Sequence, residues 1–292
     1  MPLRVAVLGP KGQCGSCVVD ELLSRGHTVV GLSRNLPTKW HDSNPNYSSL
    51  AVDVYNHDAL VRVFSDNFDA IVNAFAPPIV SLKTVYQAVI EGQLRIKSAL
   101  LASTHTPARL LSLDGIQLVD EKDFAYQHWY DWPDMHIDYM TSRSKDHGNT
   151  ALYYFCRTFK WARNTNESKG CTASTALHPK PFASFLLSRM KGFMTSTDGR
   201  GLIEGCRVAF SLWEGVSVKP WSFLSPPWQL RDKGVRTGRY SITIDHYPLD
   251  DKGVHLGIYN EDMAVAIVDE VEQNKLNHKH WCLTGEIGLG RW

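Results

Sequence analysis

The fold class of this chain is decided by one stretch, Gly9-Pro10-Lys11-Gly12-Gln13-Cys14-Gly15. This G-x-x-G-x-x-G motif follows the apolar run Leu3–Leu8 and precedes residues 17–23, whose apolar side chains recur at helical spacing. Glycines between a strand and a helix allow a sharp turn, a close backbone approach to a pyrophosphate and tight packing of the helix on the sheet. The helix N-terminus then offers N–H groups and partial positive charge to phosphates. In this context the motif favours a dinucleotide site over an ordinary glycine-rich loop.

The end of the second predicted strand, 28–32, indicates which dinucleotide is bound. An acidic residue there would accept hydrogen bonds from the ribose 2′-OH of NAD, but this chain has Ser33-Arg34-Asn35, with Lys39 a turn later. Arg34 can pair with a 2′-phosphate, although a solvated surface arginine is the alternative. We therefore predict NADP(H) as the cofactor, with NAD(H) less favoured.

Residues after the next two strands complete the predicted site. Asp53 and Val54 are placed to touch the adenine, and residues 73–76 to lie along the cofactor toward the nicotinamide. The predicted contacts are Gly9, Pro10, Lys11, Gly12, Gln13, Cys14, Gly15, Ser33, Arg34, Asn35, Lys39, Asp53, Val54, Asn73, Ala74, Phe75 and Ala76.

Alternating elements predict the rest of the fold. Further strands are expected over 50–54, 70–74 and 109–113, with helices over 58–64 and 80–101. This order predicts an α/β, Rossmann-like, doubly wound and mostly parallel sheet with helices on both faces. Residues 1–292 are expected to form a single domain, with Leu3–Leu8 central beside 28–32.

The C-terminal part returns to regular patterns. Helices are predicted over 202–213 and, capped by Asn260-Glu261-Asp262, through Val271; strands are predicted over 216–224, 240–244 and 281–284. Residues 129–198 show no sustained period and are predicted to be an irregular insertion. Three interpretations stay open for this insertion: a cover over the substrate, a disordered extension, or sequence foreign to the protein, such as a retained intron.

Composition excludes several classes of function. The 292 residues carry 31 Lys and Arg against 30 Asp and Glu, so a net charge of +1 gives no basis for binding nucleic acid or an anionic membrane directly. The sequence contains no apolar run that could cross a bilayer and no signal peptide, so we expect a cytoplasmic protein. Cys14 and Cys17 form a C-x-x-C pair without a second pair at zinc-ligand spacing; we predict reduced thiols and no metal site, with a redox or metal role as the alternative.

Taken together, the N-terminal features resemble the atypical short-chain dehydrogenase/reductase superfamily, in the NAD(P)-binding branch of NmrA-like and biliverdin/flavin reductase-like proteins. Three C-terminal or central segments also resemble that branch: Ser225-Pro226-Pro227 with Thr237-Gly238-Arg239-Tyr240, Glu261-Asp262-Met263-Ala264-Val265-Ala266, and the loop 115–124. The resemblance covers residues 3–128 and 199–285 and implies that Pro226 and Pro227 also contact the cofactor.

The catalytic pattern of typical family members is missing. They use Tyr-x-x-x-Lys with a Ser, where the Lys lowers the Tyr pKa for proton exchange with a carbonyl. This chain has only Tyr139-x-x-x-Arg143 and Tyr153-x-x-x-Arg157, and arginine does not reproduce the geometry of lysine. Tyr139 and Ser112, at the end of the fifth strand, are the candidate catalytic residues, with packing or surface roles as the alternative.

Two functions of different classes follow. One is an NADP(H)-dependent reductase of a small carbonyl, flavin or conjugated substrate. The other is an NmrA-like redox-sensing regulator that binds NADP(H) without turnover and docks onto a protein partner. The resemblance to reductases favours the first, and the absent Tyr/Lys pair favours the second. Either would act as a monomer or a dimer.

Overall fold

One large sheet organises the described part of the molecule. The computed structural model describes residues 1–36, 40, 43–77, 82–104, 109–113, 208–227, 229–231, 234–245 and 256–286. The first half contains β1 (Arg4–Leu8), α1 (Gln13–Ser24), β2 (Thr28–Ser33), β3 (Tyr47–Ala51), α2 (His57–Phe64), β4 (Ala70–Asn73), α3 (Leu82–Ala102) and β5 (Arg109–Leu113). The second half contains β6 (Trp221–Leu224), β7 (Gln229–Arg231), β8 (Tyr240–Ile244), β9 (Gly257–Tyr259), α9 (Asn260–Gln273) and β10 (Lys279–Gly285).

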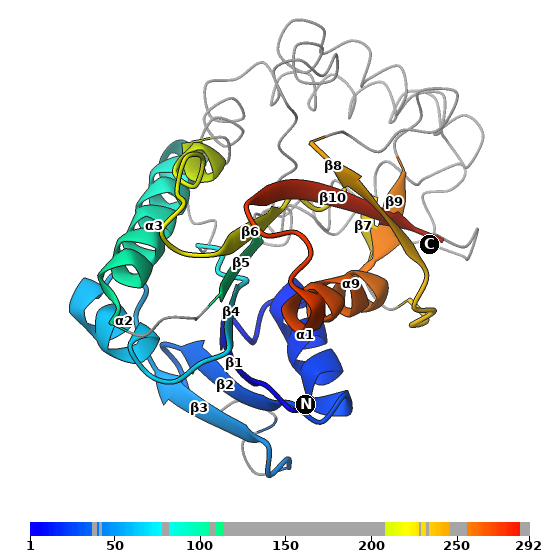
Figure 1. The fold of residues 1–292 in the computed structure, drawn as a ribbon, viewed down its shortest axis with the longest axis horizontal. Helices are drawn as coiled ribbons and strands as arrows, with labels where there is room; N and C mark the ends of the chain where they lie inside the picture. The colour runs from blue at the N-terminus through cyan, green and yellow to red at the C-terminus, as the bar shows by residue number, and fades with distance from the viewer. Residues whose placement is uncertain are drawn as a thin grey trace, which may run out of the picture.

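The strand order is that of a doubly wound fold. Eight strands lie in the order β3-β2-β1-β4-β5-β6-β10-β8 (Figure 1). All neighbouring pairs run parallel except β10 and β8. β1 lies between β2 and β4, which confirms the predicted central place of the first strand. β7 and β9 form a separate parallel pair.

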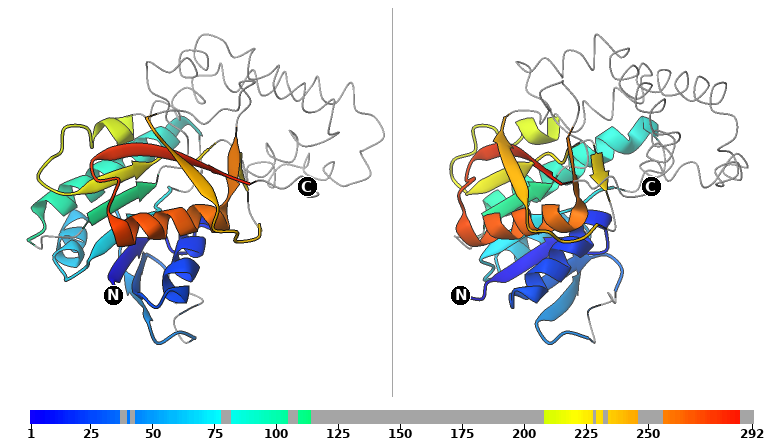
Figure 2. Two further views of the ribbon diagram at one scale, coloured as in Figure 1. Left: turned by 45° about the vertical axis from the view of Figure 1, so that its right-hand side comes forward. Right: turned by 90° about the vertical axis from the view of Figure 1, so that its right-hand side faces the viewer.

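Helices cover both faces of this sheet. Figures 1 and 2 show α1 beside α9 on one face and α2 beside α3 on the other. On the first face Leu22 of α1 and Ile267 of α9 share one fully buried core cluster. On the second face Phe64 of α2 and Leu100 of α3 share another. Each such apolar side chain contributes about 1.5–3 kcal/mol by leaving water, so two cores hold the sheet from both sides.

Local signals mark the end of α1 and the start of α2. The C-terminus of α1 is closed by Gly26, whose φ of +81° is the left-handed conformation that glycine adopts easily. α2 begins at Asn56, whose side chain accepts a hydrogen bond from the Ala59 N–H at 3.1 Å. Both ends lie within a residue or two of the predicted ones.

Several predicted bounds are wrong. The third strand spans 47–51 rather than 50–54, because Tyr47 is buried while Leu50 is 43% exposed. The strand predicted over 216–224 begins at Trp221, directly after Pro220, which has no N–H for a ladder. Of the helix predicted over 202–213, the described residues show one turn at 208–211. The insertion predicted over 129–198 lies outside the described residues.

The start of α9 also differs from the prediction. Its N-cap is Tyr259, so Asn260, Glu261 and Asp262 lie in the first helical turn instead of capping it. Asp262 is fully buried and accepts hydrogen bonds from the Thr237 N–H, the Thr237 hydroxyl and the Gly238 N–H at 2.7–2.8 Å. This carboxylate therefore joins the helix to a loop, and it joins two of the segments on which the family resemblance rests.

In the described part of the chain, α3 is the one helix of 18 residues or more, and it lacks the sustained apolarity that crossing a membrane needs.

Candidate functional site

The predicted cofactor residues meet at one edge of the sheet. Because β1, β2 and β4 are parallel, their carboxyl ends lie at the same edge. Two backbone hydrogen bonds join the segments that leave this edge: Gly9 N–H donates to Leu32 O at 3.2 Å, and Ala74 N–H donates to Leu8 O at 3.0 Å. The glycine turn thus lies between the end of β2 and the loop after β4, where open α/β sheets bind ligands.

The first and third glycines of the turn are required by space. Gly9 has a φ of +73°, and a Cβ there would lie 2.6 Å from the carbonyl oxygen of Ala74. A Cβ at Gly15 would lie 2.2 Å from the carbonyl oxygen of Gly9. Both neighbours are backbone atoms, which cannot rotate away. Glycine therefore lets α1 begin directly against the turn.

The second glycine, by contrast, faces a more open side. At Gly12 the nearest atom to an added Cβ is the carbonyl oxygen of Gly9, at 3.3 Å. Gly12 is also the N-cap of α1, so no side chain caps the helix, and the first turn contains no acidic residue. Lys11, beside it, is exposed. The N-terminus of α1 therefore presents partial positive charge without a competing carboxylate, as an anion site requires.

The end of β2 carries exposed polar side chains. Arg34 and Asn35 are exposed directly after the strand, and Ser33 is half-buried; Lys39 lies outside the described residues. Burial raises the pKa of the Tyr55 phenol, and the carboxylates of Glu91 and Asp53 raise it further, while the Arg34 guanidinium opposes them. Arg34 and Asp53 thus lie within electrostatic reach of Tyr55, beside the ends of β2 and β3.

An open hollow lies next to this group. Its walls are Asp53, Tyr55, Asn56, His57, Asp58 and Arg95. The Asp53 carboxylate accepts a hydrogen bond from the Tyr55 N–H at 3.0 Å, and the Tyr55 hydroxyl donates to the Ala88 carbonyl of α3 at 3.2 Å. The Tyr55 ring meets Phe75 edge-on, with centroids 6.1 Å apart. Asp53 is exposed here, whereas Val54 is buried in the α2–α3 core.

The loop after β4 is held by a buried amide pair that the sequence did not reveal. Asn73 is fully buried; its Oδ1 accepts from the Phe75 N–H at 3.1 Å, and its Nδ2 donates to Gln93 Oε1 at 3.2 Å. A Cβ at Gly92 would lie 2.5 Å from the Phe75 ring. The Asn73 side chain therefore holds the backbone of the loop 74–76 in place. Gln93 and Gly92 escape local pattern reading because they lie on α3, about 20 residues away.

The remaining predicted residues either stand at other strand ends of this edge or lie outside the described residues. Ser112 stands in the register between Asn73 and Phe223, at the carboxyl end of β5. Pro226 and Pro227 are buried directly after β6. Tyr139 and Tyr153 lie outside the described residues. Cys14 and Cys17 form no disulfide within the described residues, which also gather no set of three or more His, Cys, Asp or Glu that could hold a metal ion.

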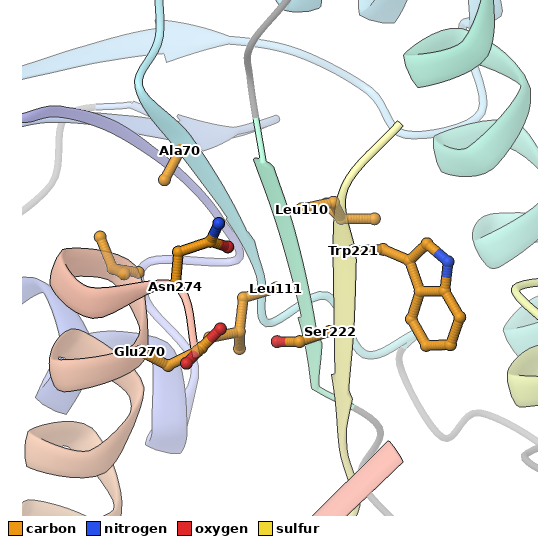
Figure 3. Close-up of a pocket in the computed structure, with 8 residues that line it drawn as sticks. Ala70, Leu110, Leu111, Trp221, Ser222, Glu270 and Asn274 are labelled. Atoms are coloured by element: carbon orange, nitrogen blue, oxygen red, sulfur yellow. The ribbon is translucent and has the colours of Figure 1, made fainter. Parts of the chain in front are cut away.

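A second, smaller cavity lies at the opposite edge and is not part of this site. Ala70, Leu110 and Trp221, which line it, stand at or near the amino ends of their strands (Figure 3). The carboxylate of Glu270, on its other wall, accepts hydrogen bonds from the N–H groups of Lys275 and Leu276 at 2.9–3.0 Å. The Glu270 carboxylate therefore holds the backbone that follows the C-terminus of α9.

Comparisons with known proteins agree with this geometry. Residues 5–113 match the model of the NAD dependent epimerase/dehydratase family. A proposed epimerase from Bacteroides thetaiotaomicron has a TM-score of 0.61 at 19% identity, over 99% of this chain and 100% of that one. A proposed NADH-flavin reductase from Streptococcus pneumoniae TIGR4 has a TM-score of 0.57 at 18% identity, over 97% and 100%. An anaerobilin reductase from Escherichia coli O157:H7 has a TM-score of 0.56 at 12% identity, over 99% and 100%. No curated protein matches the sequence.

These likenesses confirm the Rossmann-like fold class and the resemblance to the atypical short-chain dehydrogenase/reductase superfamily. The family match begins in β1 and ends at the last residue of β5, so it contains the whole glycine turn and the ends of β2, β3 and β4. Neither the NmrA-like branch nor the choice between NADP and NAD is distinguished by it, and both stay predictions.

Proposed function

We propose that this chain is an NADP(H)-dependent oxidoreductase that reduces a small carbonyl, flavin or conjugated substrate. One observation carries the proposal: at the carboxyl end of the central strand, Gly9 and Gly15 press the start of α1 against the turn, and Gly12 leaves its N-terminus without a side-chain cap. A pyrophosphate is the ligand that such a turn fits best.

The residues along the edge fit the parts of a dinucleotide in order. The phosphates would meet Gly12 and the first turn of α1. The adenosine would lie toward Arg34 and the hollow beside Asp53. The nicotinamide half would extend past the loop 74–76, which Asn73 holds in place. The chain itself would bind and orient the cofactor, and the nicotinamide would supply the hydride.

The preference for NADP(H) rests on Arg34. Residues 33–35 contain no carboxylate that could accept bonds from a ribose 2′-OH. An exposed guanidinium in this place can form two parallel charge-assisted hydrogen bonds to a 2′-phosphate. Arg34 would therefore favour NADP(H) by attraction, and the carboxylate that would favour NAD(H) is missing.

A reductase is favoured over the other activities of this fold by two of the compared structures. The Streptococcus protein is a proposed NADH-flavin reductase and the Escherichia protein an anaerobilin reductase. A flavin, the acceptor in the name of the first protein, takes up hydride through a conjugated ring system. A small conjugated or carbonyl acceptor is accordingly the substrate class that we propose here.

The test is binding and turnover of the full chain. Fluorescence titration should give saturable NADPH binding that is tighter than NADH binding, and NADPH absorbance should fall with at least one acceptor among aldehydes, quinones and FMN. Saturable binding without turnover on any acceptor would favour the regulator and contradict a reductase. Absence of binding to either dinucleotide would contradict the cofactor site itself.

A further inference from the structure

Two cysteines lie in the first turns of the helix that follows the glycine turn. Cys14 and Cys17 are the second and fifth residues of α1, whose N-cap is Gly12. Residues three apart on a helix are neighbours on one face. Both cysteines are half-buried and pack against the core cluster that α1 shares with α9, the helix beside it in Figure 1. The two thiols therefore lie on the same side of α1, and neither residue is closed off from solvent.

The Cys14 thiol also connects α1 with α9. Its Sγ donates a weak hydrogen bond, 3.9 Å long, to Oδ1 of Asn260. Asn260 is the first residue of α9 and is 2% exposed. This contact uses the hydrogen of the thiol, so it exists only while Cys14 is reduced. The oxidation state of Cys14 thus affects how the starts of the two helices are joined.

The electrostatic surroundings make Cys14 the more reactive of the two thiols. The thiolate is the form that attacks a disulfide, and the N-terminus of a helix stabilises it. The first turn of α1 contains no acidic residue that would oppose this effect. Cys14 lies in that first turn, whereas Cys17 lies one turn further along the helix. Cys14 is therefore the attacking thiol, and Cys17 is placed to displace whatever group Cys14 has taken up.

A bond between the two sulfurs would change the phosphate-binding turn. The Cβ atoms of residues three apart on a helix are about 5–6 Å apart, but a disulfide needs about 3.5–4.5 Å. Closing the bond must therefore tighten the first turns of α1. Gly15 lies between the two cysteines and has no room to yield, because a Cβ there would lie 2.2 Å from the carbonyl oxygen of Gly9. The change in α1 is consequently passed on to the glycine turn.

We propose that Cys14 and Cys17 form a reversible disulfide that weakens dinucleotide binding. The effect on binding rests on the proposed cofactor site. The oxidant is a small disulfide such as oxidised glutathione. The Cys14 sulfur attacks one of its sulfurs, the S–S bond breaks, and one glutathione leaves as the thiolate. The Cys17 sulfur then attacks Cys14 and displaces the second glutathione. Two cysteine thiols become one disulfide, one glutathione disulfide becomes two glutathione thiols, and the two cysteine protons pass to the departing thiolates.

Dinucleotide binding and oxidation oppose each other in this account. A bound pyrophosphate needs the first turn of α1 in its regular form, and the disulfide needs it tightened. Each state therefore disfavours the other, and the two effects are equal in size because linkage is reciprocal. A chain that holds NADPH resists oxidation, and an oxidised chain releases NADPH more easily. Strained disulfides are also the readily reduced ones, which suits a reversible modification.

The first test detects the disulfide without any cofactor. Trypsin cleaves after Lys11 and Arg25, so one peptide, residues 12–25, holds both cysteines. The full chain is equilibrated in a glutathione buffer, its remaining thiols are alkylated, and the peptide is weighed. The wild-type peptide should carry no alkyl group and should lack two hydrogen atoms. Cys17→Ser should instead carry glutathione on Cys14, while Cys14→Ser should leave Cys17 largely alkylated. A wild-type peptide that is alkylated at both cysteines would overturn the proposal.

The second test measures NADPH binding by fluorescence in the two states. The oxidised wild type should bind NADPH about tenfold more weakly than the reduced one, within the usual range of coupling between sites, and dithiothreitol should restore the affinity. Saturating NADPH should lower the ratio of disulfide to dithiol by a similar factor. The double variant Cys14→Ser/Cys17→Ser controls for the other four cysteines, and its affinity should not respond to the buffer.

The outcomes separate this proposal from the cofactor site on which it rests. A disulfide that forms but leaves NADPH affinity unchanged would overturn the proposal and leave the cofactor site standing. An equal loss of affinity in the double variant would assign the effect to other cysteines and overturn it as well. A reduced chain that binds no NADPH would overturn the cofactor site, and the coupling with it.

Discussion

Around the carboxyl ends of β2, β1 and β4, the candidate site is built from backbone groups: three glycines, the N-terminus of α1 and two hydrogen bonds at strand ends. Around β6, β10 and β8 a polar cluster is built from side chains instead: Ser225 directly after β6, His280 of β10 and Asp245 directly after β8. A backbone site leaves a sequence signature within seven residues, because the spaces at Gly9 and Gly15 admit only glycine. A side-chain cluster assembled over 55 residues leaves none, since each residue type is common by itself.

The largest expected effect comes from Gly15→Ala. Its Cβ would lie 2.2 Å from the Gly9 carbonyl oxygen, so α1 must move away from the turn. We expect a loss of about 2–3 kcal/mol in the free energy of unfolding, as for other overpacked sites, together with loss of NADPH binding. Urea unfolding and NADPH titration measure the two.

Gly12→Ala is the matched variant for that comparison. With 3.3 Å to its nearest neighbour, the new Cβ needs only a small adjustment, so stability should change little. NADPH binding should still weaken, by about tenfold, because the methyl group occupies the side that the pyrophosphate approaches. If Gly12→Ala binds NADPH as the wild type does, the phosphates do not lie against this turn.

An ion-pair network gives the next largest effect. Glu21 of α1 is buried and accepts hydrogen bonds from Arg25 at 2.8 Å and from Arg236 at 2.7 Å through two nitrogens. Arg25 also reaches Asp269 of α9 at 2.6 Å. Glu21→Gln should lower the free energy of unfolding by about 1–2 kcal/mol, because it weakens the hydrogen bonds to the largely buried Arg25, whereas Arg236 is 53% exposed and can turn to water. Glu91→Gln, which breaks an exposed pair with Arg95, is the control and should cost under about 1 kcal/mol.

This network also makes stability depend on pH. Burial raises the pKa of Glu21, but the hydrogen bonds and charges of Arg236 and Arg25 outweigh it and hold the pKa below the ordinary value of 4.5. A carboxylate with a lowered folded-state pKa stabilises the fold above its unfolded pKa, and this contribution is lost as pH falls through the folded value. The urea midpoint of the wild type should therefore fall more steeply than that of Glu21→Gln in acid below about pH 4.5. Parallel acid profiles of the two proteins would contradict the assignment.

The same contrast between local backbone constraints and distant side-chain contacts explains which parts of the structure the sequence predicts. The strands near 3–8, 28–32, 70–74 and 109–113 are predicted well because they are buried on both faces and read as apolar runs. The third strand is shifted because it lies at the sheet edge, where Leu50 is exposed and Tyr47 carries the burial. Edge strands have weaker patterns, since one side lacks a partner.

Long-range side-chain contacts account for most of the features that the sequence does not predict. Asn260-Glu261-Asp262 reads as a helix cap, yet Asp262 is used by Thr237 and Gly238, a contact that local spacing does not indicate. Glu21, Gln93 and His280 likewise contact distant partners: Arg236 lies 215 residues from Glu21, Asn73 lies 20 residues from Gln93, and Ser225 lies 55 residues from His280. The phosphate-binding turn is predictable because its constraints are local. The contact between Ser225 and His280 becomes visible only when the sheet register is known.

The most direct test of the NADP(H) site is the cofactor preference of Arg34→Ala. NADPH binding should weaken by about 1–3 kcal/mol, or roughly 5- to 150-fold, the scale of losing a charged hydrogen-bond partner. NADH binding should barely change, and Arg62→Ala, an exposed arginine in the last turn of α2, should leave both affinities unaltered. Fluorescence titrations of the three proteins with NADPH and NADH give the ratio. A selective loss of NADPH affinity is the result predicted here, and an equal loss for both dinucleotides, or none for either, would contradict it.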